Sequence, residues 1–153
     1  MSESDSWKVL RGTLIKEAAN KKKAIHVDRI ENLVGEGTFD TNICWAGNEF
    51  WLEGKYLKEF PVMNKTKVKI GLRPSQEVWA TRRLLVEGKI FIWLHVGAPG
   101  CNRGKGWYLI KLDSSELINQ CRYGMEQELL KTFRFDNADS LVYTLFDSFK
   151  TKT

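Results

Sequence analysis

Three ionisable residues near the middle of the chain, Asp40, Glu53 and Lys55, have types and spacing suited to phosphoryl chemistry. Hydrolysing a phosphodiester near neutral pH calls for a divalent cation, which neutralises phosphate charge and lowers the pKa of a bound water. Mg²⁺ prefers carboxylate oxygens, which Asp40 and Glu53 would supply. Residues two apart on a β-strand share a face at about 6.6 Å. Lys55 would therefore lie beside Glu53, where its amine can hold or activate the attacking water.

The sequence around these residues has the alternation of a β-hairpin, and Gly47-Asn48 is predicted to form its two-residue turn. In that register the apolar residues of both strands share one side of the hairpin. The polar residues share the other side, where Asp40 faces Lys55. The predicted turn therefore brings Asp40 to the same face as Glu53. Charged residues on an ordinary solvent-facing hairpin would give the same bare pattern, so the pattern needs support from its surroundings.

The remaining elements follow from apolar periodicity and from stop signals. A first helix is predicted with Ser6 as its N-cap, ending near Asn20. Arg73-Pro74-Ser75 opens a second helix that Gly88 closes. Further helices are predicted at 114–132 and 139–149, and strands at 25–31, 39–45, 49–55, 90–96 and 107–112. This order predicts an α/β sandwich in which helices flank a central mixed β-sheet.

Composition limits the class of protein. The chain has 153 residues, 42% of them hydrophobic, which suits a single domain over residues 1–153 with C-terminal helices at about 114–150. A formal net charge of +5 favours an anionic partner. No apolar run approaches the roughly 20 residues of a membrane span, and no secretory signal begins the chain, so a cytoplasmic protein without membrane contact is expected. Three scattered cysteines argue against a zinc site.

Several motifs stand around the three ionisable residues in a fixed order. They are Arg29-Ile30-Glu31-Asn32, Gly37-Thr38-Phe39-Asp40, Glu49 to Lys55, Leu72 to Gln76, and Trp79. From about His26 to His95 this order resembles the PD-(D/E)xK nucleases, and most closely the VRR-NUC type with its small stand-alone, phage-encoded relatives. Phe39 departs from the pattern, because the family usually has proline there.

The resemblance implies a restriction-endonuclease-like fold and a metal-dependent endodeoxyribonuclease. Asp40 and Glu53 would then bind Mg²⁺ or Mn²⁺, Lys55 would serve the nucleophilic water, and Gln76 would support the site. A further acidic residue often comes from the first helix or strand in this superfamily. Glu17 and Glu31 compete for that role: Glu31 lies within a resembling motif, whereas Glu17 lies beside the apolar stripe of the first helix.

Basic residues outside these motifs are candidates for phosphate contacts, because sequence-independent charge pairing dominates duplex binding. The set is Lys21, Lys22, Lys23, Arg73, Arg82 and Arg83, with Arg103 and Lys105 in the glycine-rich connection at 97–106. That connection lacks the Ser or Thr of a phosphate-binding loop after its lysine. His95 lies in an apolar strand and is interpreted as a hydrogen-bonded structural residue.

The expected substrate also follows from the resemblance. Stand-alone members of this group resemble homodimeric junction resolvases, which implies a phage protein that cuts branched DNA, such as Holliday junctions, during replication, recombination or packaging. Apolar residues of the C-terminal helices would form the dimer interface or else the monomer's own core. Two alternatives remain open: a nuclease that nicks or degrades ordinary duplex, and a catalytically inactive DNA-binding protein on the nuclease fold, for which Phe39 is the hint. An unrelated basic interaction module would leave the ordered motifs unexplained.

Overall fold

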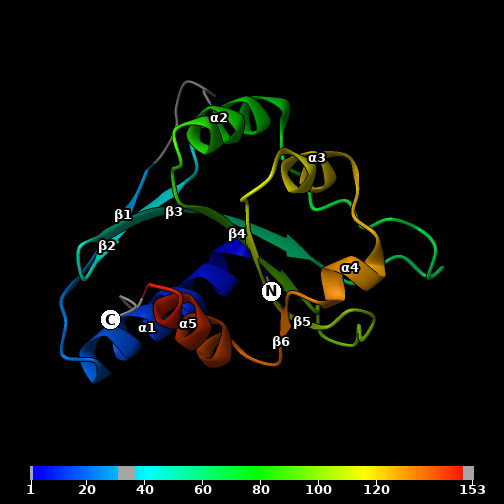
Figure 1. Ribbon diagram of the computed structural model, residues 1–153. Coiled ribbons are helices and arrows are strands. Elements are labelled where there is room, and N and C mark those ends of the chain that lie inside the picture. Colours follow the sequence, from blue (N-terminus) through cyan, green and yellow to red (C-terminus); the bar gives the residue numbers. More distant parts are fainter. Residues whose placement is uncertain (1, 31–36, 150–153) are drawn as a thin grey trace.

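A computed structural model describes residues 2–30 and 37–149 of the chain (Figure 1). Its six-stranded sheet has the strand order β1-β2-β3-β4-β5-β6. β3 and β4 are parallel, and all other neighbours are antiparallel. The strands are β1 Ile25–Arg29, β2 Thr41–Trp45, β3 Asn48–Leu57, β4 Ile90–Val96, β5 Gly106–Lys111 and β6 Arg134–Phe135. The helices are α1 Glu3–Asn20, α2 Pro74–Leu85, α3 Ser115–Tyr123, α4 Gln127–Lys131 and α5 Ala138–Asp147.

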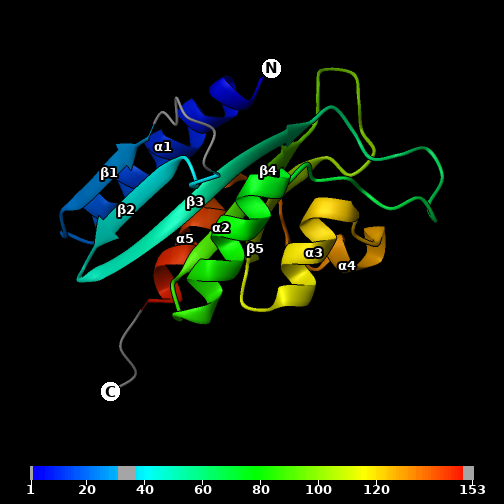
Figure 2. The ribbon, with the colours of Figure 1, turned by 90° about the horizontal axis from the view of Figure 1, so that it is seen from above.

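Helices cover both faces of the sheet, which confirms the predicted α/β sandwich with a mixed sheet. α1 and α5 pack together on one face, and α2 and α3 pack on the other (Figures 1 and 2). All seven residues of β4 are buried, and their side chains alternate between the two cores: Ile92 joins the α2 side, whereas Phe91 and Trp93 join the α1 side. β4 is therefore the central strand that its nearly continuous apolar run predicts.

The hairpin of β2 and β3 differs from its predicted register by two residues. Its turn residues are Ala46 and Gly47, both with positive φ (50° and 78°), and Trp45 pairs with Asn48. The type I′ turn explains these angles. A shift of two residues leaves each side chain on its predicted face, because the side-chain period of a strand is two. The predicted pairing of Asp40 with Lys55 is nevertheless wrong.

α1 begins one turn earlier than predicted. Ser2 is its N-cap: the Ser2 hydroxyl accepts a hydrogen bond from the Asp5 backbone N–H at 3.2 Å, and the Asp5 carboxylate accepts one from the Ser2 backbone N–H at 2.9 Å. Ser6 is not a cap. It is fully buried inside the helix, with Oγ 2.7 Å from Nδ1 of His95, and burial lowers the pKa of that imidazole. His95 thus makes the structural hydrogen bond expected of it.

The C-terminal third contains a break and a strand that its pattern did not predict. Gly124, with φ 141°, ends α3, and Met125 forms an isolated β-bridge with Val68 before α4 begins. The apolar residues considered for a dimer interface all pack within the two cores of this one chain: Leu117, Ile118, Leu129, Leu130, Phe133, Leu141, Leu145 and Phe149. Within the described ranges, no helix is long and apolar enough to cross a membrane.

Candidate active site

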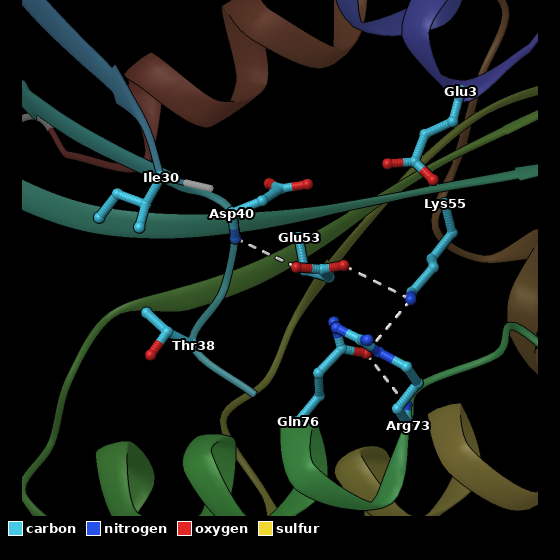
Figure 3. A pocket seen from close by; sticks show the side chains of 8 residues that line it. All are labelled: Glu3, Ile30, Thr38, Asp40, Glu53, Lys55, Arg73 and Gln76. Carbon is cyan, nitrogen blue, oxygen red and sulfur yellow. Dashed lines mark hydrogen bonds and ion pairs between the residues drawn. The ribbon is translucent and has the colours of Figure 1, made fainter. Parts of the chain in front are cut away.

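The candidate site is a pocket of about 360 Å³ where β2 begins, between the N-terminal turns of α1 and α2 (Figure 3). The lining residues are Glu3 of α1, Asp40 before β2, Glu53 and Lys55 of β3, Gln76 of α2, Arg73 just before α2, and Ile30 and Thr38. Asp40, Glu53, Lys55 and Gln76 are thus brought together in one cavity, from segments up to 36 positions apart in the sequence.

Gly54 lets Glu53 and Lys55 point into the pocket while β3 stays close to β4. Its register partner on β4 is Trp93, which is 1% exposed. A Cβ atom at position 54 would lie 2.1 Å from Cζ2 of the Trp93 ring. The indole covers the strand from the α1 side, so the two ionisable side chains face the α2 side from a strand that is firmly packed behind them.

Asp40 is positioned by the segment before it, which packs against the start of α2. Gly37 has a positive φ of 76°, and a Cβ there would lie 2.1 Å from the backbone oxygen of Ser75. Phe39 is fully buried, with its ring centroid 4.6 Å from that of Trp79. Where the resembling family has proline, this chain holds the turn by burying an aromatic side chain.

Three side chains and two backbone N–H groups form a continuous polar network in the pocket (Figure 3). The Asp40 backbone N–H donates to Oε1 of Glu53 at 3.1 Å, which places Asp40 opposite Glu53 rather than Lys55. Nζ of Lys55 lies 3.4 Å from Oε2 of Glu53 and donates to Oε1 of Gln76 at 3.2 Å. Gln76 is 1% exposed, and its Oε1 also accepts from the Arg73 backbone N–H at 3.0 Å. Gln76 thereby fixes the Lys55 amine relative to α2.

The surroundings of Asp40 and Glu53 disfavour the ionised form of each carboxyl group. Burial, and next the negative charge of Asp40, raise the pKa of Glu53 from 4.5 to about 7, although Lys55 opposes the rise. Burial also raises the pKa of Asp40, against the hydrogen bond from the Thr41 hydroxyl at 2.9 Å and the charge of Arg29. Two partly desolvated carboxyl groups in one pocket form a site whose ionised state a divalent cation would stabilise.

A third carboxyl group comes from a residue that sequence reasoning missed. Glu3 lines the pocket from the first turn of α1, and burial together with the charge of Asp40 raises its pKa. One Arg29 nitrogen lies 4.0 Å from Oε1 of Glu3 and 4.0 Å from Oδ2 of Asp40. Those two oxygens are therefore within about 8 Å of each other. The signal that could have found Glu3 is the capping box Ser2 to Asp5, which places it in a helix.

Glu17, one of the two acids proposed from the sequence for this third position, does not line the pocket. Glu17 lies 14 residues after Glu3 on α1, about 21 Å along the helix axis. It accepts a hydrogen bond from Asn20 and lines a separate cavity with Asp139 and Tyr143. The prediction for Glu17 is thus wrong in position. Glu31 lies outside the described residues.

The donor set fits a hard divalent cation bound in part by solvent and phosphate. Asp40 and Glu53 offer carboxylate oxygens, which Mg²⁺ and Mn²⁺ accept, and Mg²⁺ commonly uses one or two carboxylates besides water and substrate phosphate. Across residues 2–30 and 37–149, no three acidic, histidine or cysteine side chains are close enough to enclose a metal by themselves.

Among the basic candidates, only Arg73 lines the pocket. Lys21 and Lys23 contact the rings of Tyr143 and Trp45 at the far end of α1, with exposed Lys22 between them. The Arg83 guanidinium lies 5.4 and 5.1 Å from the ring centroids of Trp51 and Trp79, beside exposed Arg82 in the last turn of α2. Arg103 is paired with Glu59 at 2.6 Å, and Lys105 is exposed.

Comparisons with known proteins identify the fold. No protein-family model matches the sequence, and no curated protein does. Among solved structures, the chain is similar to Hjc, a Holliday junction resolvase of the archaeal hyperthermophile Archaeoglobus fulgidus. The TM-score is 0.50 at 10% identity, over 91% of this chain and 98% of that one. With its mixed sheet between helical layers, this chain has a restriction-endonuclease-like α/β fold.

Proposed function

We propose that this protein is a metal-dependent DNA endonuclease that prefers branched DNA. The observation that carries the proposal is the convergence of Asp40, Glu53 and Lys55 in one pocket, with Lys55 held between Glu53 and Gln76. A solvent-facing hairpin would leave these side chains in water. Here Glu53 is 6% exposed, and its pKa is raised to about 7. The fold therefore holds the Glu53 carboxyl group where its ionised form is disfavoured.

Asp40 and Glu53 would hold Mg²⁺ or Mn²⁺, which supplies Lewis-acid stabilisation of phosphate charge and a bound water of lowered pKa. The Lys55 amine carries three donors and is fixed by its contacts with Glu53 and Gln76. It would orient the attacking water and stabilise negative charge on the phosphate oxygens. The water oxygen gives up a proton to solvent and forms a bond to phosphorus as the bond to one sugar oxygen breaks, and the leaving oxygen takes up a proton from solvent. Arg73, at the pocket rim, would hold the scissile strand.

Two observations support DNA as the substrate, and only the first of them bears on branched DNA. One is the structural likeness to a protein described as a Holliday junction resolvase. The other is the net charge of +5, which favours binding of a polyanion. The metal is Mg²⁺ in this proposal, with Mn²⁺ as a substitute. A homodimer that acts on symmetric junctions in phage recombination or packaging is the part of the proposal that rests on the sequence resemblance alone.

A cleavage assay tests the proposal. A labelled four-way junction and a linear duplex of the same sequence are incubated with the wild type, Asp40→Asn and Lys55→Ala, each with Mg²⁺ and with EDTA. We expect Mg²⁺-dependent cutting of the junction by the wild type alone, with each variant at least about a hundredfold slower. Equal cutting of both DNAs would instead indicate a general duplex nuclease. DNA binding without cleavage in any divalent metal would indicate an inactive DNA-binding protein and refute the catalytic proposal.

A further inference from the structure

A loop at residues 58–72 leaves the sheet after β3 and returns at α2 (Figures 1 and 2). Both of its ends are anchored in the candidate active site: β3 carries Glu53 and Lys55, and Arg73 and Gln76 follow the loop directly. The C-terminal end of the loop therefore adjoins the pocket.

The tip of the loop presents two apolar side chains to solvent. Val62 and Met63 are 74% and 69% exposed, although Phe60, just before them, is 2% exposed. The tip is not held by its own apolar contacts but by Gln127 of α4, which is 4% exposed. The amide nitrogen of Gln127 donates to the backbone oxygens of Met63 and Thr66, both at 3.0 Å.

Further contacts fix the loop on both sides. The Phe60 backbone N–H donates to the Arg103 backbone oxygen at 3.0 Å, and Val68 exchanges backbone hydrogen bonds with Met125 at 2.8 and 2.9 Å. The loop is therefore pre-organised, so that presenting Val62 and Met63 costs little ordering entropy on binding. Such exposure of apolar surface on a fixed support is typical of an interaction site.

The surroundings of the tip are basic. Lys58, Lys65, Lys67 and Lys69 are all exposed, and within residues 2–30 and 37–149 none of them forms an ion pair. Lys67 and Lys69 alternate with the buried residues Val68 and Ile70, which places these two lysine side chains on one outward-facing side. The one acidic residue of the loop, Glu59, is neutralised by Arg103 at 2.6 Å. The loop thus combines an apolar tip with an uncompensated row of cations.

We propose that the 58–72 loop is a wedge that inserts Val62 and Met63 between bases at the branch point of the DNA while its lysines hold the flanking phosphates. Apolar side chains that enter the base stack must pay for unstacking. That cost is least where the stack is already interrupted, as it is at a branch. The wedge therefore supplies a physical reason for selecting branched over linear DNA. This inference rests on the proposed function, which it extends from the cleavage chemistry to the recognition of DNA shape.

An anionic membrane surface would also attract an apolar tip with a basic surround. DNA is favoured because the loop begins three residues after Lys55 and ends directly before Arg73, both of which line the candidate site, and because Lys67 and Lys69 lie on the segment that leads back to Arg73. Binding to anionic vesicles is therefore included as an outcome of the test.

The test measures binding in EDTA, so that it does not depend on cleavage. Fluorescence anisotropy gives the affinity for a four-way junction and for a linear duplex, and 2-aminopurine at the branch reports unstacking. The Val62→Ser/Met63→Ser variant removes the wedge. Leu85→Ser/Val86→Ser is the matched control, because these residues are 78% and 73% exposed but lie at the far end of α2. All substituted side chains are at the surface, and circular dichroism verifies that both variants fold.

We expect the wedge variant to bind the junction about tenfold or more weakly and linear duplex within about twofold, with the 2-aminopurine signal lost. The control should match the wild type. The Lys65→Gln/Lys67→Gln/Lys69→Gln variant should bind both DNAs more weakly, and its binding should depend less on salt concentration. The wedge is refuted if Val62→Ser/Met63→Ser binds the junction normally, or if it loses affinity for the junction and the duplex equally. It is also refuted if the wild type binds anionic vesicles and no DNA. Selective junction binding without cleavage would refute only the proposed nuclease activity.

Discussion

Replacing Glu53 by glutamine should stabilise the metal-free protein above neutral pH. Raising the pKa of Glu53 from 4.5 to about 7 means that the folded protein binds this proton more tightly than the unfolded chain does. The unfolded chain ionises first as pH rises, so stability falls between about pH 4.5 and 7. The full loss is about 3 kcal/mol, at about 1.4 kcal/mol for each pKa unit. Glu53→Gln removes this penalty and keeps an acceptor for the Asp40 backbone N–H.

Urea unfolding in EDTA, near pH 8 and near pH 5, measures the effect. We expect Glu53→Gln to be more stable than the wild type by about 2–3 kcal/mol near pH 8 and by less than about 1 kcal/mol near pH 5, where Glu53 is already protonated in the folded state. Added Mg²⁺ should reverse the order near pH 8, because only the wild type retains both carboxylates. A variant that is less stable near pH 8, or a difference that does not change with pH, would refute the electrostatic account of the site.

Two packing predictions accompany it. Gly54→Ala should lower the free energy of unfolding by about 1–3 kcal/mol in chemical denaturation, because its Cβ would lie 2.1 Å from the Trp93 ring. The control is Gly12→Ala, in open space on α1, which should be neutral or stabilising by about 1 kcal/mol. If both glycines respond alike, close approach is not the reason for Gly54. Ser6→Ala should cost about 1–3 kcal/mol by leaving buried Nδ1 of His95 without its partner. An unchanged denaturation midpoint would count against that buried hydrogen bond.

The pattern of the sequence predicted the faces of the hairpin better than its register. Gly47-Asn48 and Ala46-Gly47 are both plausible two-residue turns, and they differ by two positions in pairing. Because two positions are one full side-chain period, Asp40 still falls beside Glu53. The error in the predicted turn therefore does not change the predicted location of the site. The pairing itself could not be predicted, because it depends on how Trp45 and Phe50 pack against α5 and its neighbours.

Glu3, the acidic residue that α1 contributes to the pocket, was not predicted from the local sequence pattern. Ser2 and Ser6 can both cap a helix, and choosing Ser6 left Glu3 outside the predicted element. Glu17 lies nearly four turns after Glu3 and so on the same side of the helix. The side of α1 that carries the acid was therefore predicted correctly. Which end of α1 reaches the pocket depends on the direction in which the helix crosses the sheet, and that direction is a tertiary property. The two-residue strand β6 is likewise fixed only by pairing with β5.

The central claim is that Asp40 and Glu53 share a divalent cation. Isothermal titration of the metal-free protein with Mn²⁺, beside Asp40→Asn and Glu53→Gln, tests it most directly. We predict a Mn²⁺ site in the wild type that weakens at least about tenfold in each variant and strengthens as pH rises through about 7, where Glu53 ionises. Wild-type affinity retained in both variants would place the metal elsewhere and contradict the account.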